Sequence, residues 1–432
     1  MWKNSFIRLY LSSIIILIAI QAEAQPGLSS PYSTFGLGYL SHGNNVRSKS
    51  MGSIGIGTRD CYTVNVYNPA SYTAFDSTSF VFDGGIVGLY TKLKTNTINE
   101  EIITGSISNF LFGFPVTKWW RSSFGLLPFS NVGYNVVDYE YKDNIGNIQY
   151  EYEGTGGISR FFWGNAFKPA KFLSFGINAS YLFGTIDRMQ TVAFPDSLYL
   201  INTKINNSIT VRDFDFDVGI QIHTELKKDL KLIVGGVFHP RINLNAERNY
   251  LAQTYLRKIN DVEIFRDTVA YTPEEKGTVL IPVGFGLGFS LAKEDKWLIG
   301  ADYKHENWKD FKSFDINDSL CNSNTYAIGF QYTPDKYSIT SYLKRIDYRI
   351  GARYSQSYLD LRDEHIDGFG ITFGVGLPLR SVSFRGTKSM LNFGFEIGKR
   401  GTTVNSLIQE NYFKIYFGVS IYEWWFIKRR YK

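Results

Sequence analysis

Cysteine, histidine and long apolar runs are scarce in this chain of 432 residues. Its two cysteines, Cys61 and Cys321, are too few for a disulfide framework and have no partners at the spacing of a zinc site. The five histidines are scattered, and neither a G-x-S-x-G elbow nor an H-E-x-x-H motif occurs. We therefore expect no metal, no cofactor and no enzymatic activity. Beyond the first 24 residues there is no continuous apolar 18-mer, so any membrane insertion must use strands.

Charge of one sign is not concentrated anywhere. The 46 Lys and Arg residues exceed the 40 Asp and Glu residues only slightly, and the net charge of +6 is spread along the chain, so no nucleic-acid partner is expected. Aromatic residues are abundant, with 29 Tyr, 34 Phe and 8 Trp beside 40 Gly. A disordered chain would be poor in aromatics, and this composition therefore indicates a folded protein.

The amino terminus has the pattern of a secretory signal peptide. Lys3 and Arg8 precede a mostly apolar run from Leu9 to Ile20, and Ala22-Glu23-Ala24 supplies the small-x-small pattern of a cleavage site. The apolar run is too short to span a bilayer. We expect residues 1–24 to be removed during export across the inner membrane.

Most of the remaining sequence alternates with a period of two, which is the pattern of a β-strand. Residues 211–226 read VRDFDFDVGIQIHTEL, with large apolar residues on one side and mostly acidic, polar or small residues on the other. In residues 279–291 the alternation places Val279, Ile281 and Phe285 on one apolar side, opposite a row that is rich in glycine. One face of each segment therefore suits hydrocarbon, and the other suits a packed interior.

Fourteen such segments lie between residues 79 and 425. An even number suits a closed antiparallel barrel whose two chain ends lie on one side of a membrane. Short polar turns alternate with long connections at 139–156, 189–208 and 247–277, as in outer-membrane barrels. We therefore predict an all-β fold, with residues 78–432 forming a transmembrane antiparallel barrel. A soluble β-sandwich also shows alternation, but it could not hide so much apolar surface.

Residues 25–77 do not fit a barrel wall, because they are irregular and rich in glycine. Three motifs follow one another there: GLG, then R-x-x-x-M-G, then NPA. Their residues are Gly36, Gly38, Arg47, Met51, Gly52, Asn68, Pro69 and Ala70. Each glycine could also serve only a tight turn, and Asn68-Pro69 could only begin one.

The order of these motifs resembles the amino-terminal hatch of the FadL-type long-chain fatty acid transporters. The resemblance is close over the signal peptide, the hatch and the first strand, and the rest of the barrel agrees in strand number and loop rhythm. It implies a barrel of about 14 strands with residues 25–77 inside the lumen as a plug. It also implies passive passage of hydrophobic compounds such as fatty acids, with the eight hatch residues above forming a gate.

The third predicted strand, residues 120–138, contains Pro128 between Gly125 and Gly133. Proline cannot donate to a strand ladder, and a closed barrel has no edge strand to accommodate it. In the resembled family an inward turn of this strand opens the wall sideways, which would let an apolar substrate leave into lipid. A local β-bulge at Pro128 is the open alternative.

Two rows of like charge are predicted to face the lumen. Asp213, Asp215 and Asp217 form one row, and Arg345, Arg349 and Arg353 form the other. Like charges in a confined space need partners of opposite charge, so a salt-bridge network that holds the hatch is one interpretation. The other is that one of the arginines binds the carboxylate head group of a substrate.

We therefore expect a protein of the outer membrane of a Gram-negative bacterium that moves hydrophobic small molecules passively, in contact with outer-membrane lipid. The alternative is a FadL-like barrel that binds proteins at its extracellular loops, as a PorV-like shuttle component of a secretion system. The hatch motifs do not separate the two. A substrate-sized apolar cavity continuous with a gap beside Pro128 would favour transport, whereas a sealed wall with a large exposed platform would favour protein partners.

Overall fold

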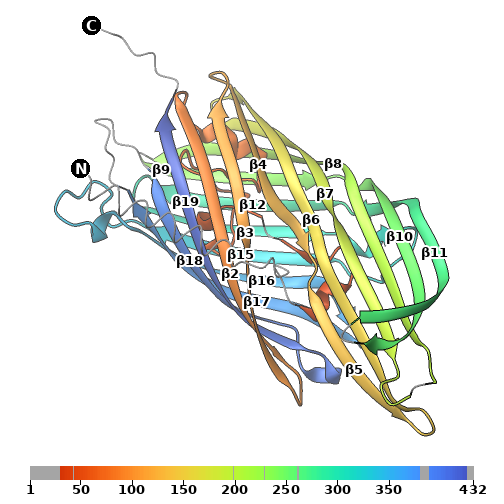
Figure 1. The fold of residues 1–432 in the computed structure, drawn as a ribbon. Coiled ribbons are helices and arrows are strands. Elements are labelled where there is room, and N and C mark those ends of the chain that lie inside the picture. Colours follow the sequence, from red (N-terminus) through yellow and green to blue (C-terminus); the bar gives the residue numbers. More distant parts are fainter. Residues whose placement is uncertain are drawn as a thin grey trace, which may run out of the picture.

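The computed structural model describes residues 30–41, 43–197, 199–227, 229–259, 262–379 and 389–425. The predicted signal peptide, residues 1–24, lies outside these ranges. Nineteen strands belong to one antiparallel sheet (Figure 1). They are β1 (Tyr39–Leu40), β2 (Ser79–Lys94), β3 (Asn99–Pro115), β4 (Trp120–Asn131), β5 (Tyr134–Lys142), β6 (Gly146–Ala170), β7 (Leu173–Ala193), β8 (Asn202–Lys227), β9 (Leu230–His239), β10 (Ile242–Ile259), β11 (Val262–Ile281), β12 (Gly284–Lys293), β13 (Trp297–Glu306), β14 (Lys312–Ser313), β15 (Ser323–Tyr332), β16 (Asp347–Leu361), β17 (Glu364–Pro378), β18 (Met390–Arg400) and β19 (Gln409–Trp424).

The sheet closes on itself, because β19 pairs with β2 from Gln409 opposite Lys94 to Trp424 opposite Ser79. Four wall strands are each built from two consecutive segments, namely β4 with β5, β9 with β10, β11 with β12 and β13 with β14. With these joined, and with β1 set aside, the wall is a closed antiparallel barrel of 14 strands. The predicted fold class and strand number are confirmed.

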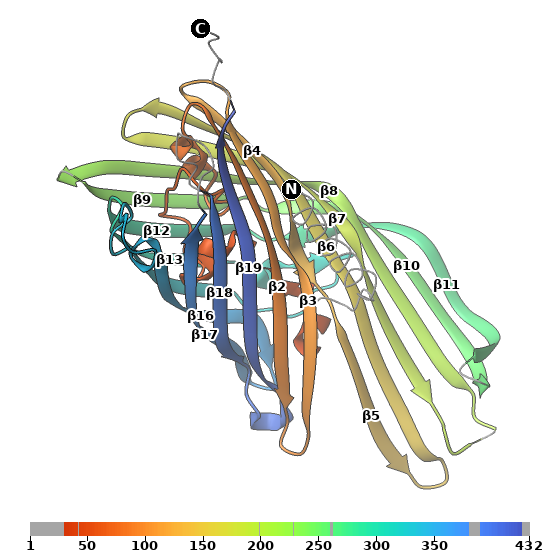
Figure 2. The same ribbon diagram turned by 60° about the vertical axis from the view of Figure 1, so that its left-hand side comes forward.

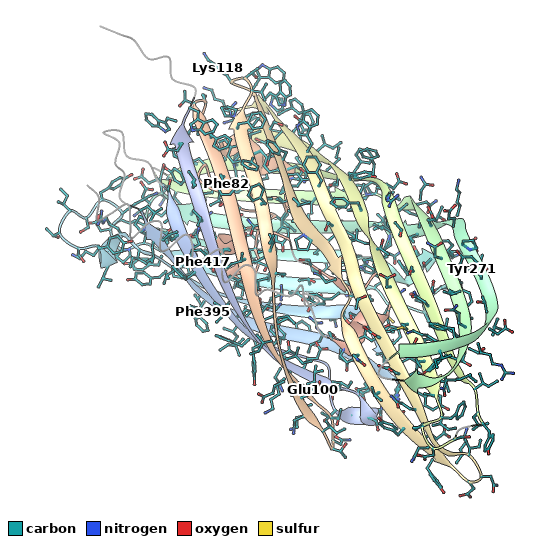
Figure 3. The ribbon with its side chains drawn as sticks, viewed as in Figure 1. Phe82, Glu100, Lys118, Tyr271, Phe395 and Phe417 are labelled. Carbon is teal, nitrogen blue, oxygen red and sulfur yellow. The ribbon has the colours of Figure 1, made fainter. Side chains whose placement is uncertain are left out.

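Alternation along each wall strand separates an apolar outer face from a polar inner face. On β8, the Phe214 side chain on the outer face is 58% exposed, whereas that of Asp215 on the inner face is completely buried. Figure 3 places Phe82, Phe395 and Phe417 along the middle of the wall, and Lys118 and Glu100 at its two ends. An apolar belt of this kind is what a membrane-spanning barrel presents to lipid. No helix in the described ranges is long and apolar enough to cross a membrane.

Residues 279–291 do not keep the single alternation that the sequence predicts. Val279 and Ile281 are buried, whereas Phe285 is exposed, so the residues predicted to share one face lie on different faces. The cause is the interruption between β11 and β12 at Pro282, which has no N–H for the ladder and allows the pattern to restart in the opposite sense.

The three predicted long connections are not loops. Residues 139–156, 189–208 and 247–277 are largely occupied by strand, and they form the hairpins β5–β6, β7–β8 and β10–β11. These hairpins extend one side of the rim beyond the rest (Figures 1 and 2). The sequence misleads here because the apolar outer face ends while backbone pairing continues. We call this the long-hairpin end, and the opposite rim, where β3 meets β4 and β12 meets β13, the short-turn end.

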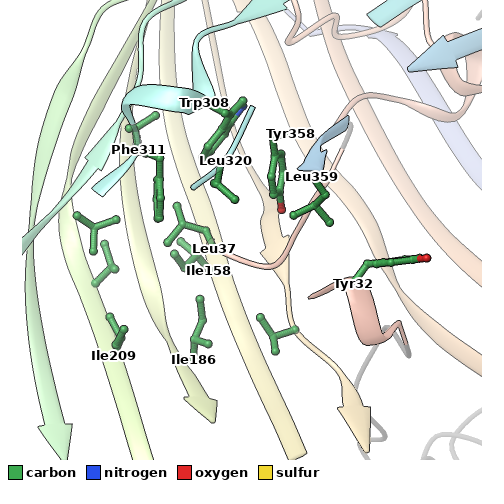
Figure 4. Packing of buried hydrophobic residues seen from close by; sticks show 14 of the residues in the cluster. Tyr32, Leu37, Ile158, Ile186, Ile209, Trp308, Phe311, Leu320, Tyr358 and Leu359 are labelled. Atoms are coloured by element: carbon green, nitrogen blue, oxygen red, sulfur yellow. The ribbon is translucent and has the colours of Figure 1, made fainter. Parts of the chain in front are cut away.

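The amino-terminal segment lies inside the barrel (Figure 2). Besides β1, it forms the short elements η1 (Pro31–Thr34), α2 (Val46–Lys49) and η2 (Pro69–Ala74). The remaining short helices, η3 (Trp308–Asp310), η4 (Leu343–Arg345) and η5 (Val404–Ser406), connect wall strands. Figure 4 shows one of the cores between the segment and the wall, where Leu37 packs near Ile158, Trp308 and Phe311. We refer to residues 30–77 as the hatch.

Candidate lateral opening and hatch

The NPA motif anchors one part of the hatch to the wall. The Asn68 side chain caps η2 by accepting from the Ala70 N–H at 3.1 Å, and Pro69 fills the first turn, where no N–H is needed. The same Asn68 amide donates to the carbonyls of Ile56 at 2.9 Å and Ile220 at 3.1 Å. Ala70 is completely buried. A side chain at Gly219 on β8 would overlap the Asn68 amide, so the wall is shaped around this motif.

The R-x-x-x-M-G motif anchors a second part. Arg47 pairs with Asp60 at 2.7 Å, within the hatch, and donates to Gln331 on β15 at 3.0 Å. Met51 is 1% exposed and packs against the wall at Gly329. Gly52 has a φ of +67°, and a Cβ there would lie 2.6 Å from the Ala352 carbonyl oxygen, so this position needs glycine for both its conformation and its space.

The two glycines of the first motif, Gly36 and Gly38, form hydrogen bonds with residues toward the long-hairpin end of the barrel. The Gly36 N–H donates to Asp318 at 3.1 Å, and its carbonyl accepts from Arg188 on β7 at 2.6 Å. The Gly38 carbonyl accepts from the Tyr358 hydroxyl on β16. All eight predicted hatch residues are therefore within the segment that contacts the inner wall.

Asp302 on β13 is a hatch anchor that sequence reasoning missed. Its carboxylate accepts from three successive backbone N–H groups, those of Gly55 at 2.6 Å, Ile56 at 2.8 Å and Gly57 at 3.4 Å. A carboxylate that accepts several backbone N–H groups makes strong, charge-assisted bonds. Asp302 belongs to an inward row with Leu298 and Glu306, and an acid on the inward face of a predicted strand is the signal that could have found it.

The wall is interrupted beside Pro128. Pairing between β3 and β4 ends at Phe110 opposite Leu126, and among the described residues no wall pairing joins the rest of β3 to β4 or β5. Instead, β1 of the hatch pairs with β4 at Asn131 and Ser130. The other edge of β4 stays paired with β6, with an irregularity between Pro128 and Ser130. We call the unpaired interval between β3 residues 99–109 and the β4–β5 strand the lateral gap.

The three predicted residues of the third strand all border this gap. A Cβ at Gly125 would lie 2.5 Å from the Phe110 carbonyl oxygen, at the last paired position. Gly133 falls between β4 and β5, and its carbonyl accepts from the Ser30 N–H of the hatch at 2.7 Å. The wall strand therefore leaves its neighbour after Leu126, the residue that follows Gly125, and is bonded to the hatch by Gly133.

Two cavities meet at the lateral gap. One, of about 90 Å³, lies between β3 residues 104–108 and Pro128. The other, of about 260 Å³, lies inside the barrel and has a mostly apolar lining that includes Phe129, Val237 and Trp308. Both are lined by Tyr39, Ser41, Pro128 and Arg353, so they adjoin.

The aspartate row finds its partners within its own side of the barrel. Asp215 pairs with Arg160 on β6 at 2.9 Å and with His239 on β9 at 2.6 Å, and Asp217 pairs with Arg160 at 3.3 Å. Asp213 accepts from the backbone and side-chain amides of Asn245. These carboxylates are structural, and among the described residues none of them pairs with the arginine row.

The arginine row is not a single row. Arg345 lies in η4, in the turn before β16, so its prediction as a strand residue is wrong; the strand begins only at Asp347. Arg349 bonds Gln331, Asn392 and Asp347 and is completely buried, so its hydrogen-bonding capacity is used within the wall. Arg353 pairs with Glu396 at 2.7 Å and also lines both cavities.

Solved structures of several hydrocarbon channels have the same fold. The chain is similar to a Pseudomonas aeruginosa FadL homologue, with a TM-score of 0.58 and 11% identity over 90% of this chain and 99% of that one. It is similar to the P. putida toluene transporter TodX, with a TM-score of 0.58 and 15% identity over 88% and 98% of the two chains. The Ralstonia pickettii toluene transporter TbuX gives a TM-score of 0.54 and 12% identity over 88% and 98%.

At these identities the likeness establishes the fold of a FadL-like barrel and nothing finer. A comparison with functionally curated proteins found no match. A family model, that of BamG, matches residues 6–432, which is nearly the whole chain. The chain therefore belongs to the BamG family.

Proposed function

We propose that this protein is a passive outer-membrane channel for hydrophobic compounds such as long-chain fatty acids, in which the substrate leaves sideways through the lateral gap. The observation that carries the proposal is the interruption of the wall between β3 and the β4–β5 strand, with an internal apolar cavity adjoining it. The hatch acts as the gate, since its strand β1 occupies one margin of the gap.

A sideways exit follows from the chemistry of the cargo. Moving a methylene group from an apolar environment into water costs about 0.8 kcal/mol, so a long alkyl chain would face a barrier of roughly 10 kcal/mol on an aqueous route. The hatch crosses the lumen between this cavity and the short-turn end, and the space beyond it is lined by charged groups such as Arg47 and Asp60. A path from the cavity through the gap into lipid avoids both obstacles.

Two facing glycines allow a matched test. Gly105 is exposed at the outer mouth of the gap cavity, on the unpaired edge of β3, whereas its cross-strand partner Gly88 is exposed on β2 and does not line the cavity. Both have room for a side chain, since a Cβ at Gly88 meets nothing within 4 Å and a Cβ at Gly105 lies 3.7 Å from its nearest neighbour. We expect Gly105→Trp to lower uptake of labelled oleate by cells at least fivefold and Gly88→Trp to leave it unchanged. Equal uptake in all strains, including cells that lack the protein, would reject transport.

Protein binding is the second candidate function, and the long-hairpin end favours it. Its strands extend past the apolar belt and still expose large side chains, with Tyr139 at 63%, Tyr141 at 70% and Tyr271 at 64%. Exposed tyrosines are common in protein interfaces. A PorV-like shuttle role would use this sheet and would need neither the cavity nor the gap.

A further inference from the structure

Four cations gather around the gap cavity. Lys49 from the hatch, Arg353 from β16, Arg400 from β18 and Lys414 from β19 all line it. Three of them lie against aromatic rings: Arg400 is 4.1 Å from the centre of the Tyr39 ring, Lys49 is 5.4 Å from that of Tyr416, and Lys414 is 4.6 Å from that of Tyr412. Among the described residues, Glu410 supplies the only carboxylate that lines the same cavity.

The described carboxylates neutralise only part of this charge. Glu396 is 2.7 Å from Arg353 and 3.8 Å from Lys414, so it serves both. Glu410 is 3.5 Å from Arg400. When all four basic side chains are protonated, they outnumber these two carboxylates by two.

Lys49 is the cation without a carboxylate. It is 7% exposed and donates to the Ser108 hydroxyl at 2.5 Å, and no described carboxylate forms an ion pair with it. Burial, together with the neighbouring Lys414, lowers the pKa of Lys49 to about 7. A buried ammonium in this position is costly unless an anion accompanies it.

An unpaired hydroxyl group in the gap cavity is a second, independent sign of a ligand. The Thr104 hydroxyl on β3 is buried and has no hydrogen-bond partner within the part of the chain that the structure describes. Thr104 also lines the gap cavity. Buried polar groups are almost always bonded, so an unpaired one beside an excess of cations indicates a missing hydrogen-bonding guest.

We propose that the gap cavity is a binding site for the anionic head group of an amphiphile, with Lys49, Lys414 and Thr104 contacting the head and a phosphate monoester preferred to a carboxylate. The proposal rests on the proposed function, because the tail would lie in the adjoining apolar cavity or in lipid. At about 90 Å³ the gap cavity has room for a head group but not for a chain. The charge excess of two matches a phosphate dianion better than a single carboxylate.

The test measures binding of three ligands with the same tail. Radiolabelled dodecyl phosphate, dodecanoate and dodecanol are titrated against the full-length mature protein in a neutral detergent. We expect dodecyl phosphate to bind at least tenfold more tightly than dodecanol, with dodecanoate between them. Lys49→Met should reduce the phosphate preference to less than threefold while binding of dodecanol is unchanged, and Lys49→Arg should keep most of it.

Lys92 provides the control, since it is an exposed lysine on β2 that pairs with Glu101 outside the cavity. Lys92→Met should bind all three ligands as the unmodified protein does. Thr104→Val is a second variant that removes no charge, and it should lower the affinity for dodecyl phosphate about threefold while leaving that for dodecanol unchanged. Heat-modified mobility on gels confirms that each variant is folded.

Equal affinity for the phosphate and the alcohol would overturn the proposal, as would identical effects of Lys49→Met and Lys92→Met. Displacement of dodecyl phosphate by equimolar inorganic phosphate would also overturn it, because the site would then take a free ion rather than an amphiphile. Dodecanol binding and uptake without any preference for the acids would leave the proposed channel intact. Failure of all three ligands to bind would reject the channel itself.

Discussion

Single polar side chains on the inner wall decide how firmly the hatch is held. The sequence predicts which residues face inward, as it does for Asp215, but not what they meet. Arg160 reaches Asp215 although β7 lies between their two strands, and such a contact depends on the radius of the barrel. Lys49 was missed for a related reason, since a lysine in a short irregular segment carries no pattern of its own.

Asp302→Ala should loosen the hatch without unfolding the barrel. It leaves the N–H groups of Gly55, Ile56 and Gly57 without their acceptor, at a cost of about 1 to 3 kcal/mol for each well-formed bond. We expect a several-fold rise in ion conductance across planar bilayers. Asp213→Ala is the control, because the described hydrogen bonds of Asp213 are to the wall residues Asn245 and Phe214, and an equal rise there would contradict the role of Asp302.

At the scale of elements, the lateral gap depends on the hatch as much as on the third strand. Pro128 lies beside the place where the pairing of β3 with β4 ends. It could not indicate that β1 takes over one margin, because a two-residue strand has no periodicity to detect. The same limit explains the hairpins: period-two patterns identify strands that face lipid, and they weaken where both faces meet water.

Pro128→Ala should therefore leave the gap open. The pairing of Tyr39 with Asn131 and the bond from Ser30 to Gly133 still turn the β4–β5 strand toward the hatch. We expect uptake of labelled oleate within twofold of the unmodified protein, at equal amounts of folded barrel in the outer membrane. A loss of uptake as large as that of Gly105→Trp would make the proline itself the cause of the opening.

At the scale of the molecule, the two ends of the barrel differ in a way that can separate the two candidate functions. The short-turn end exposes Trp119 at 56% and Trp425 at 63%, as expected of the aromatic girdle at a membrane interface. At the long-hairpin end the strands extend further on one side of the barrel than on the other (Figure 2). Strand number and closure followed from the sequence, whereas this asymmetry did not.

Shortening the β10–β11 hairpin tests whether the long-hairpin end is needed for uptake or for protein binding. Replacing residues 249–274 by Asn-Gly keeps the pairing below and the Arg248–Glu275 ion pair, and supplies a favoured two-residue turn. For a channel we expect uptake of hydrophobic compounds within twofold of normal, since the belt and the lateral gap are untouched. Loss of co-purifying proteins on shortening, with uptake no higher than in cells that lack the protein both before and after the change, would favour the binding role instead.

The glycines that let the hatch backbone touch the wall have a consequence for how this family can vary. At Gly219, Gly288 and Gly351 the wall meets hatch atoms with no room for another carbon. Neither surface can therefore be altered alone: enlarging a wall residue there requires the facing hatch turn to retreat in the same step. Plug and cylinder are expected to diversify as a matched pair, while the lipid-facing exterior drifts independently of both.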